Sequence, residues 1–194
     1  MNFDLSDEHR LLRDSVREFA EGEVAPIAEE IDHNKRFPIE IVKKMGELGW
    51  MGIPFPEEYG GAGGDALGYA IAVEELTRID SSVAITLCAH TSLGTQPIYL
   101  FGSDEQKAEW LPKLTSGQIL GAFGLTEPEA GSDAGNTQTR AELSDGEWTI
   151  NGAKQFITNA GTEISGLVSI TAVTGEDENG RKEISNLIVP NDTP

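Results

Sequence analysis

Apolar residues recur at helical spacing through the first 117 residues of this 194-residue chain. Leu12, Val16 and Phe19 share one face of a first helix, and Ser6 is a suitable N-cap for it. Further helices are predicted from Pro38 to the stop at Gly49, at 66–79, at 82–93, and from the capping-box sequence at 103–106 to Gly117. Five or more helices with short connections are typical of a bundle-like domain.

After Gly117 the pattern changes to short strand-like segments separated by turn dipeptides, of which Asp145-Gly146 and Asn151-Gly152 are the clearest. An antiparallel meander is predicted from strands at 137–143, 147–150 and 153–158, with two more strands at 166–173 and 183–190. We therefore expect an α+β multidomain chain. A helical N-terminal domain over 1–120 is followed by the first part of an antiparallel β-barrel domain over 121–194. About 75 residues of β structure are fewer than a closed barrel usually needs, so we expect a fragment or a truncated product.

The charge balance narrows the possible partners. Lys and Arg number 14 against 33 Asp and Glu, a formal net charge of -19. Such a chain repels phosphodiester backbones and anionic membrane surfaces, so nucleic acid and membrane binding are not expected. Cys88 is the only cysteine, and no secretion signal or long apolar run is present. A reducing, cytoplasmic location is expected.

Several motifs invite a functional interpretation that their context does not support. The glycine-rich run 60–64 partly fits a dinucleotide-binding fingerprint, but Pro54 and Pro56 spoil the strand that should precede it. A tight surface loop is expected there. Glu74 and Arg78 have the spacing of an ordinary helical ion pair. The three histidines (His9, His33 and His90) lack metal-ligand spacing, so we expect surface or packing roles and no metal site.

The segment from 123 to 158 carries the most specific chemistry. Thr126 and Thr158 place hydroxyls beside Leu125 and Ile157, at points where two strands could lie together. A flat ring with polar edges suits such a surface. The turn 131–133 offers backbone N–H groups and a hydroxyl that could bind a phosphate or an amide. On these residues alone, an ordinary sheet with cross-strand threonines and a polar turn explains the pattern equally well.

Longer stretches carry a family resemblance. They are F-x-L-S-D-E-H-R-L-L-R-D near the start, L-G-W-M-G-I-P-F-P-E-E-Y-G-G-A-G-G-D, F-G-S-D-E-Q-K-A-E-W-L-P-K-L-T-S-G, G-L-T-E-P-E-A-G-S-D-A-G at 124–135 and N-G-A-K-Q-F-I-T-N-A at 151–160. Over its full length the chain resembles the acyl-CoA dehydrogenases, and the run 89–98 looks most like their short-chain or butyryl type. The resemblance implies a helical domain, a β-barrel domain and a second helical domain, of which the last is missing here.

The resemblance also implies a cofactor, FAD, and a set of residues that bind it. These are Phe123, Leu125, Thr126, Gly131 and Ser132 along one edge, with Phe156, Ile157 and Thr158 on the other side. Thr126 would hydrogen-bond the flavin ring, and Thr158 would donate to the ring nitrogen that accepts hydride. Members often carry Trp at the position of Phe156, where an aromatic ring is retained. Ser132 would also contact the acyl-CoA substrate.

The implied reaction is α,β-desaturation of an acyl-CoA to a trans-2-enoyl-CoA, an oxidoreductase step of fatty acid β-oxidation. No catalytic residue is assignable, because the family's glutamate base lies in the missing C-terminal domain. The chain alone is therefore expected to bind FAD weakly and not to turn over. Full-length members are homotetramers that pass electrons to an electron-transferring flavoprotein. An acyl-CoA oxidase-like flavoenzyme and a non-catalytic binding or assembly protein with this fold remain as alternatives.

Overall fold

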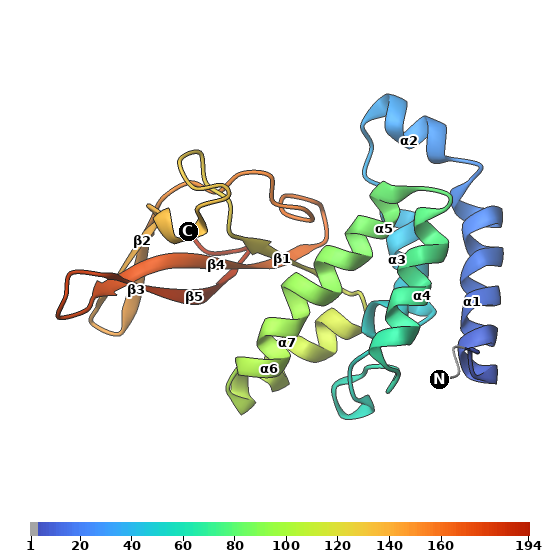
Figure 1. Cartoon of the computed structure of the whole chain (residues 1–194), viewed down its shortest axis with the longest axis horizontal. Coiled ribbons are helices and arrows are strands. Elements are labelled where there is room, and N and C mark those ends of the chain that lie inside the picture. Colours follow the sequence, from blue (N-terminus) through green and yellow to red (C-terminus); the bar gives the residue numbers. More distant parts are fainter. Residues whose placement is uncertain (1–3) are drawn as a thin grey trace.

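The computed structural model describes residues 4–194 and gathers the helices at one end of the molecule and the strands at the other (Figure 1). The α-helices are α1 (Asp7–Phe19), α2 (Ala28–Asn34), α3 (Ile39–Glu47), α4 (Ala66–Thr77), α5 (Ser81–Cys88), α6 (Gln96–Phe101) and α7 (Asp104–Thr115). The strands are β1 (Leu120–Gly124), β2 (Arg140–Ser144), β3 (Glu147–Asn151), β4 (Ser165–Glu176) and β5 (Lys182–Pro190). The expected order, a helical N-terminal part followed by the beginning of a sheet domain, is confirmed.

Side-chain caps begin α1, α4, α5 and α7, whereas α3 begins after Pro38 without one. The Ser6 hydroxyl accepts from the N–H of His9 at 3.2 Å. Ser103 and Gln106 form a complete capping box, in which each side chain bonds the other residue's backbone N–H, as predicted. Such caps satisfy N–H groups that have no partner inside the helix, so they fix where each helix begins.

Two helices continue through a π-helical turn, and the second thereby extends beyond the predicted range 82–93. The first continues from α1 through Ala20–Val24, and α5 continues through Ala89–Thr95 into α6. The second π-helical segment lies against β1, where a Cβ on Gly94 would stand only 2.3 Å from the carbonyl carbon of Gly121. Glycine at both positions therefore permits this close approach of helix and strand.

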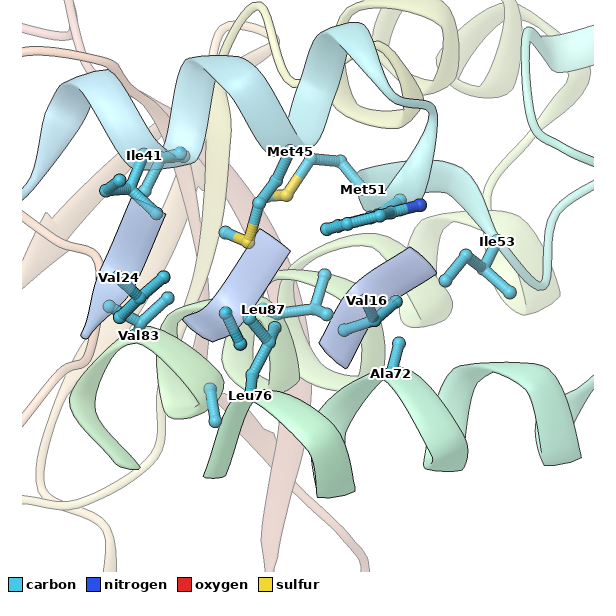
Figure 2. Packing of buried hydrophobic residues seen from close by; sticks show 14 of the residues in the cluster. Val16, Val24, Ile41, Met45, Met51, Ile53, Ala72, Leu76, Val83 and Leu87 are labelled. Carbon is cyan, nitrogen blue, oxygen red and sulfur yellow. The ribbon is translucent and has the colours of Figure 1, made fainter. Parts of the chain in front are cut away.

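The main core fills the space between the helices. Figure 2 shows side chains of α1, α3, α4 and α5 pointing into one shared interior. Its fully buried members include Val16, Met45, Met51, Leu76 and Leu87. A smaller cluster of Ile98, Leu111, Leu114 and Leu167 joins α6 and α7 to β4. Apolar burial of this extent is the main source of stability for such a chain.

The five strands form one mixed sheet in the order β1-β4-β2-β3, with β5 on the other edge of β4. The antiparallel arrangement expected from the sequence holds for β2 with β3 and for β4 with β5. It does not hold for β1, which runs parallel to β4 over Leu120–Gly124, nor for the single β2–β4 contact at Arg140. Since β1 and β4 are joined by a long connection, a parallel pairing is open to them.

Three local predictions are corrected. Residues 153–158 form no strand, since Phe156 has a left-handed φ of +59° that interrupts an extended chain. Asn151-Gly152 is not a turn: Gly152 lies where a Cβ would be 2.2 Å from the hydroxyl oxygen of Thr139. Arg78 pairs with Glu75 at 2.7 Å instead of with Glu74. The Asp145-Gly146 turn between β2 and β3 is confirmed, with positive φ at both residues.

The glycine-rich run is a tight loop, as expected. Its N–H groups are used inside the protein: those of Gly61, Gly63 and Gly64 donate to the carbonyls of Pro56, Phe55 and Ile53 at 2.8–3.1 Å. Donors engaged in this way cannot cradle a phosphate. Within residues 4–194, no helix has the length and apolar character needed to cross a bilayer.

Candidate functional site

A cavity of about 250 Å³ lies where the sequence predicted a site. Six of the eight predicted cofactor-binding residues line it: Phe123, Leu125, Thr126, Phe156, Ile157 and Thr158. Ala89 and Leu93, from the π-helical segment, complete its wall. The cavity is smaller than the roughly 300–1,000 Å³ of a complete small-molecule site, so this surface would contact one part of a large ligand.

Two segments that are distant in sequence form the cavity. Phe123 belongs to β1, and Leu125 and Thr126 follow directly after that strand. The N–H of Gln155 donates to the carbonyl of Thr126 at 2.9 Å, which draws the 154–158 loop alongside. The two segments therefore lie side by side as predicted, but through a loop contact instead of a strand pair.

The cavity wall presents an aromatic ring and hydroxyl groups that have no partner of their own. Phe156 is 86% exposed, and its left-handed backbone aims it outward at an energetic cost of order 1–3 kcal/mol, a strain that proteins retain mainly at functional sites. Neither the hydroxyls nor the N–H groups of Thr126 and Thr158 bond to any group within residues 4–194. These free donors beside an exposed ring fit a flat ligand with polar edges.

A buried ion pair that was not predicted from the sequence adjoins the cavity, since Lys154 also donates to the carbonyl of the lining residue Leu125. The Nζ of Lys154 is 2.7 Å from Oε1 of Glu127, and their side chains are 11% and 2% exposed. Burial alone would raise the pKa of Glu127, but hydrogen bonds from Lys154 and Thr137 outweigh it and hold the pKa well below the ordinary value. The sequence offered one clue to this pair: Glu127 and Lys154 each lie in a segment of small and polar residues.

Buried polar groups attach this site to the helices. His90 is fully buried: its Nε2–H donates to the carbonyl of Leu114 at 3.0 Å, and its Nδ1 accepts from the N–H of Gly121 at 3.1 Å. Burial lowers the pKa of His90 to about 4, so the imidazole is neutral. The amide of Asn159 donates to the carbonyl of Thr86 in α5 at 3.0 Å. The packing role expected for His90 is therefore confirmed, in a helix-to-strand contact.

The other two predicted site residues lie outside the cavity. Gly131 and Ser132 occupy an exposed turn that follows a short backbone bridge between Glu127 and Ala130. That bridge folds the chain back on itself after Thr126. Their assignment to FAD and to acyl-CoA stays a prediction, because the cavity brings together only the other six residues.

The sequence of the chain matches the patterns of a known protein family. The pattern of the acyl-CoA dehydrogenase N-terminal domain matches residues 6–118, and that of the acyl-CoA dehydrogenase middle domain matches 122–194. A short-chain specific acyl-CoA dehydrogenase of Clostridium acetobutylicum is 51% identical over 97% of this chain and 49% of its own length.

Solved structures agree in fold. Butyryl-CoA dehydrogenase from Megasphaera elsdenii is 41% identical with a TM-score of 0.93, over 100% of this chain and 51% of that one. An acyl-CoA dehydrogenase from Bacillus anthracis, complexed with FAD, is 37% identical with a TM-score of 0.88, over 97% of this chain and 32% of that one. The chain spans about half the length of the curated relatives it matches. The two domain matches and these identities show that the chain belongs to the acyl-CoA dehydrogenase family.

Proposed function

We propose that this chain carries the flavin-facing surface of an FAD-dependent acyl-CoA dehydrogenase that acts on short acyl chains. The observation that supports the proposal most directly is the cavity between the end of β1 and the 154–158 loop. Its ring and its free donors suit an isoalloxazine, which is flat, apolar on its faces and rich in acceptors at its edges. Relatives named as short-chain and butyryl enzymes, and one complexed with FAD, support the same assignment.

The residues of the cavity have distinct proposed roles. Thr126 and Thr158 would donate hydrogen bonds to acceptors at the ring edge, and Phe156 and Ile157 would pack against its face. Ala89 and Leu93 would limit the room beside the ring. When bound, FAD supplies the two-electron acceptor for desaturation.

The substrate and the assembly follow from the family. We propose a CoA thioester of a short acyl group as substrate, with Ser132 contacting it, and an electron-transferring flavoprotein as the electron acceptor. A homotetramer in the cytoplasm is the proposed form of the whole protein. No residue of this chain is proposed as the base that removes the α-proton.

A flavin titration of the purified chain tests the proposal. FAD fluorescence and visible circular dichroism would report binding, and butyryl-CoA-dependent dye reduction would report turnover. We expect weak but saturable FAD binding and no turnover, with Thr158→Val and Thr126→Val each weakening the binding about tenfold through loss of a hydrogen bond to the ring.

Thr149→Val is the matched control, because Thr149 is an exposed β3 threonine outside the cavity. It should leave FAD affinity unchanged. Absence of any FAD binding by the chain, or equal loss of affinity in all three valine variants, would count against the proposed site.

A further inference from the structure

Two of the segments that line the cavity are loops, and no strand pairing joins them to each other. Leu125 and Thr126 have left β1, and residues 152–159 contain no strand. The backbone bond from Gln155 to Thr126 is one direct link between them. A wall built from irregular segments needs other contacts to hold its donors at a fixed separation, since loops are the more mobile parts of a fold.

Lys154 supplies contacts to several elements at once. Its ammonium lies 3.2 Å from the carbonyl of Leu125, 3.1 Å from the hydroxyl of Thr171 in β4 and 2.7 Å from the Glu127 carboxylate. The first of these contacts fixes the peptide that leads into Thr126. Lys154 therefore ties its own loop both to the sheet and to the opposite cavity segment.

Glu127 extends the same link to a third segment. Its carboxylate accepts from the N–H of Gln138 at 2.6 Å and of Thr139 at 3.1 Å, and from the hydroxyl of Thr137. Residues 137–139 lead into β2, so the pair connects the end of β1, the entry to β2 and the 154–158 loop. Both charged side chains are almost completely buried, at 11% and 2% exposed.

We propose that the Glu127–Lys154 pair is a positioning device that sets the separation of Thr126 and Thr158 and thereby the affinity for flavin. The inference rests on the proposed function, because it concerns the segments proposed to face FAD. Both residues act through others: Thr126 follows the carbonyl that Lys154 holds, and Thr158 lies on the loop that Lys154 anchors. A buried charge without its partner is strongly unfavourable, so the two charges must act together.

Four variants of the 194-residue chain test the pair: Glu127→Gln, Lys154→Met, the double variant, and Glu75→Gln as matched control. Glu75 is also a buried carboxylate paired with arginines, but it joins α1 to α4 and lies outside the cavity. FAD titration would measure affinity. Hydrogen exchange by mass spectrometry would compare peptides covering 120–140 and 150–160 with those covering α3 and α4.

We expect each single variant to weaken FAD binding at least about tenfold and to speed exchange in the two cavity segments, with α3 and α4 unchanged. The double variant should stay about as weak as the single variants, because it also lacks the Lys154 contacts to Leu125 and Thr171, and its loss should be smaller than the two single losses combined. Glu75→Gln should change the FAD affinity by less than about twofold. Loss of affinity confined to the variants of this pair, with faster exchange only in the two cavity segments, is a pattern that a general support of the fold would not give. Return of the original affinity in the double variant would show that an uncompensated charge, and not lost positioning, weakens the binding.

Other outcomes overturn the inference in recognisable ways. Unchanged FAD affinity and exchange in both single variants would show that the pair positions nothing, and exchange raised equally in α3 and α4 would make it a support of the whole fold. A double variant as weak as the two losses combined would show that the charges act separately. If the unsubstituted chain binds no FAD, the proposed function fails, and the exchange pattern alone then decides whether the pair holds the two segments.

Discussion

Among residues 4–194, two carboxylates are buried, Glu75 in the helical region and Glu127 in the sheet region, and their partners differ. Glu75 accepts from Arg17 and Arg78 at 2.7 Å, and both arginines remain about half in solvent, at 41% and 48% exposed. Glu127 is paired with a lysine that is only 11% exposed. Helices α1 and α4 already have regular backbones fixed by capping and packing. The segments around Glu127 lack a regular backbone of this kind. We therefore expect the charged pair to hold these segments in place.

The largest effect is predicted for a substitution that breaks the Glu127–Lys154 ion pair. Lys154→Met leaves the Glu127 carboxylate buried without its cation, which should lower the free energy of unfolding by about 3–5 kcal/mol. Urea denaturation at neutral pH measures it. Lys43→Met, at an exposed lysine of α3, is the control and should stay within about 0.5 kcal/mol of the original chain. Equal effects from the two substitutions would remove the contrast between buried and exposed lysines.

The second prediction concerns His90, which joins the two regions. Its folded pKa of about 4 lies below the unfolded value of about 6.5, so the unfolded chain binds the extra proton first as pH falls. Stability contributed by neutral His90 is complete above pH 6.5 and is lost progressively down to about pH 4. The loss between pH 7 and pH 5 should be about 2 kcal/mol.

Thermal or urea unfolding at both pH values measures this loss. The variant His90→Asn removes the titrating group, so its stability should vary less over the same interval by roughly the same 2 kcal/mol. A variant with the pH dependence of the original chain would assign that dependence to other groups.

The third prediction tests the helical member of the comparison. Glu75→Gln removes the charge at a site where Arg17 and Arg78 can turn to water, so the expected loss of stability is about 1–2 kcal/mol, smaller than for Lys154→Met. The hydrogen bond from Arg17 lowers the pKa of Glu75 and burial raises it, and the net pKa lies below the ordinary value. Its stabilisation should therefore be present above the unfolded pKa and decline in acid. A loss matching that of Lys154→Met would show that the two carboxylates are equivalent.

The smallest predicted effect lies in the exposed turn. Ser132→Ala alters a residue that lines no part of the cavity and should change stability by less than about 0.5 kcal/mol. If Ser132 contacts the acyl-CoA, the same substitution should weaken binding of butyryl-CoA to the FAD-loaded chain, measured by calorimetry. Unaltered butyryl-CoA affinity would remove Ser132 from the proposed substrate site.

Local patterns were enough for the elements whose ends are chemically marked. The capping box at Ser103 and the turn at Asp145-Gly146 depend on residues within a few positions of each other, and both were predicted correctly. The helix α2 and the π-helical turns were missed, because a π-helical turn changes the helical spacing that the prediction counts. Residues 153–158 were predicted as a strand from their local pattern, but Phe156 has a left-handed φ and the N–H of the preceding Gln155 bonds the distant Thr126, which the local pattern does not show.

The sequence by itself determined the order of helical and sheet regions and the family, and it predicted that the segments around Thr126 and Thr158 would lie together. The order follows from the local spacing of apolar residues, and the family follows from longer stretches whose residues match in order. The tertiary structure alone decided that β1 runs parallel to β4, that Ala89 and Leu93 close the cavity, and that Gly131 and Ser132 lie outside it. It also decided that Glu127 and Lys154 form one buried pair, because burial and pairing depend on residues 27 positions apart meeting in space.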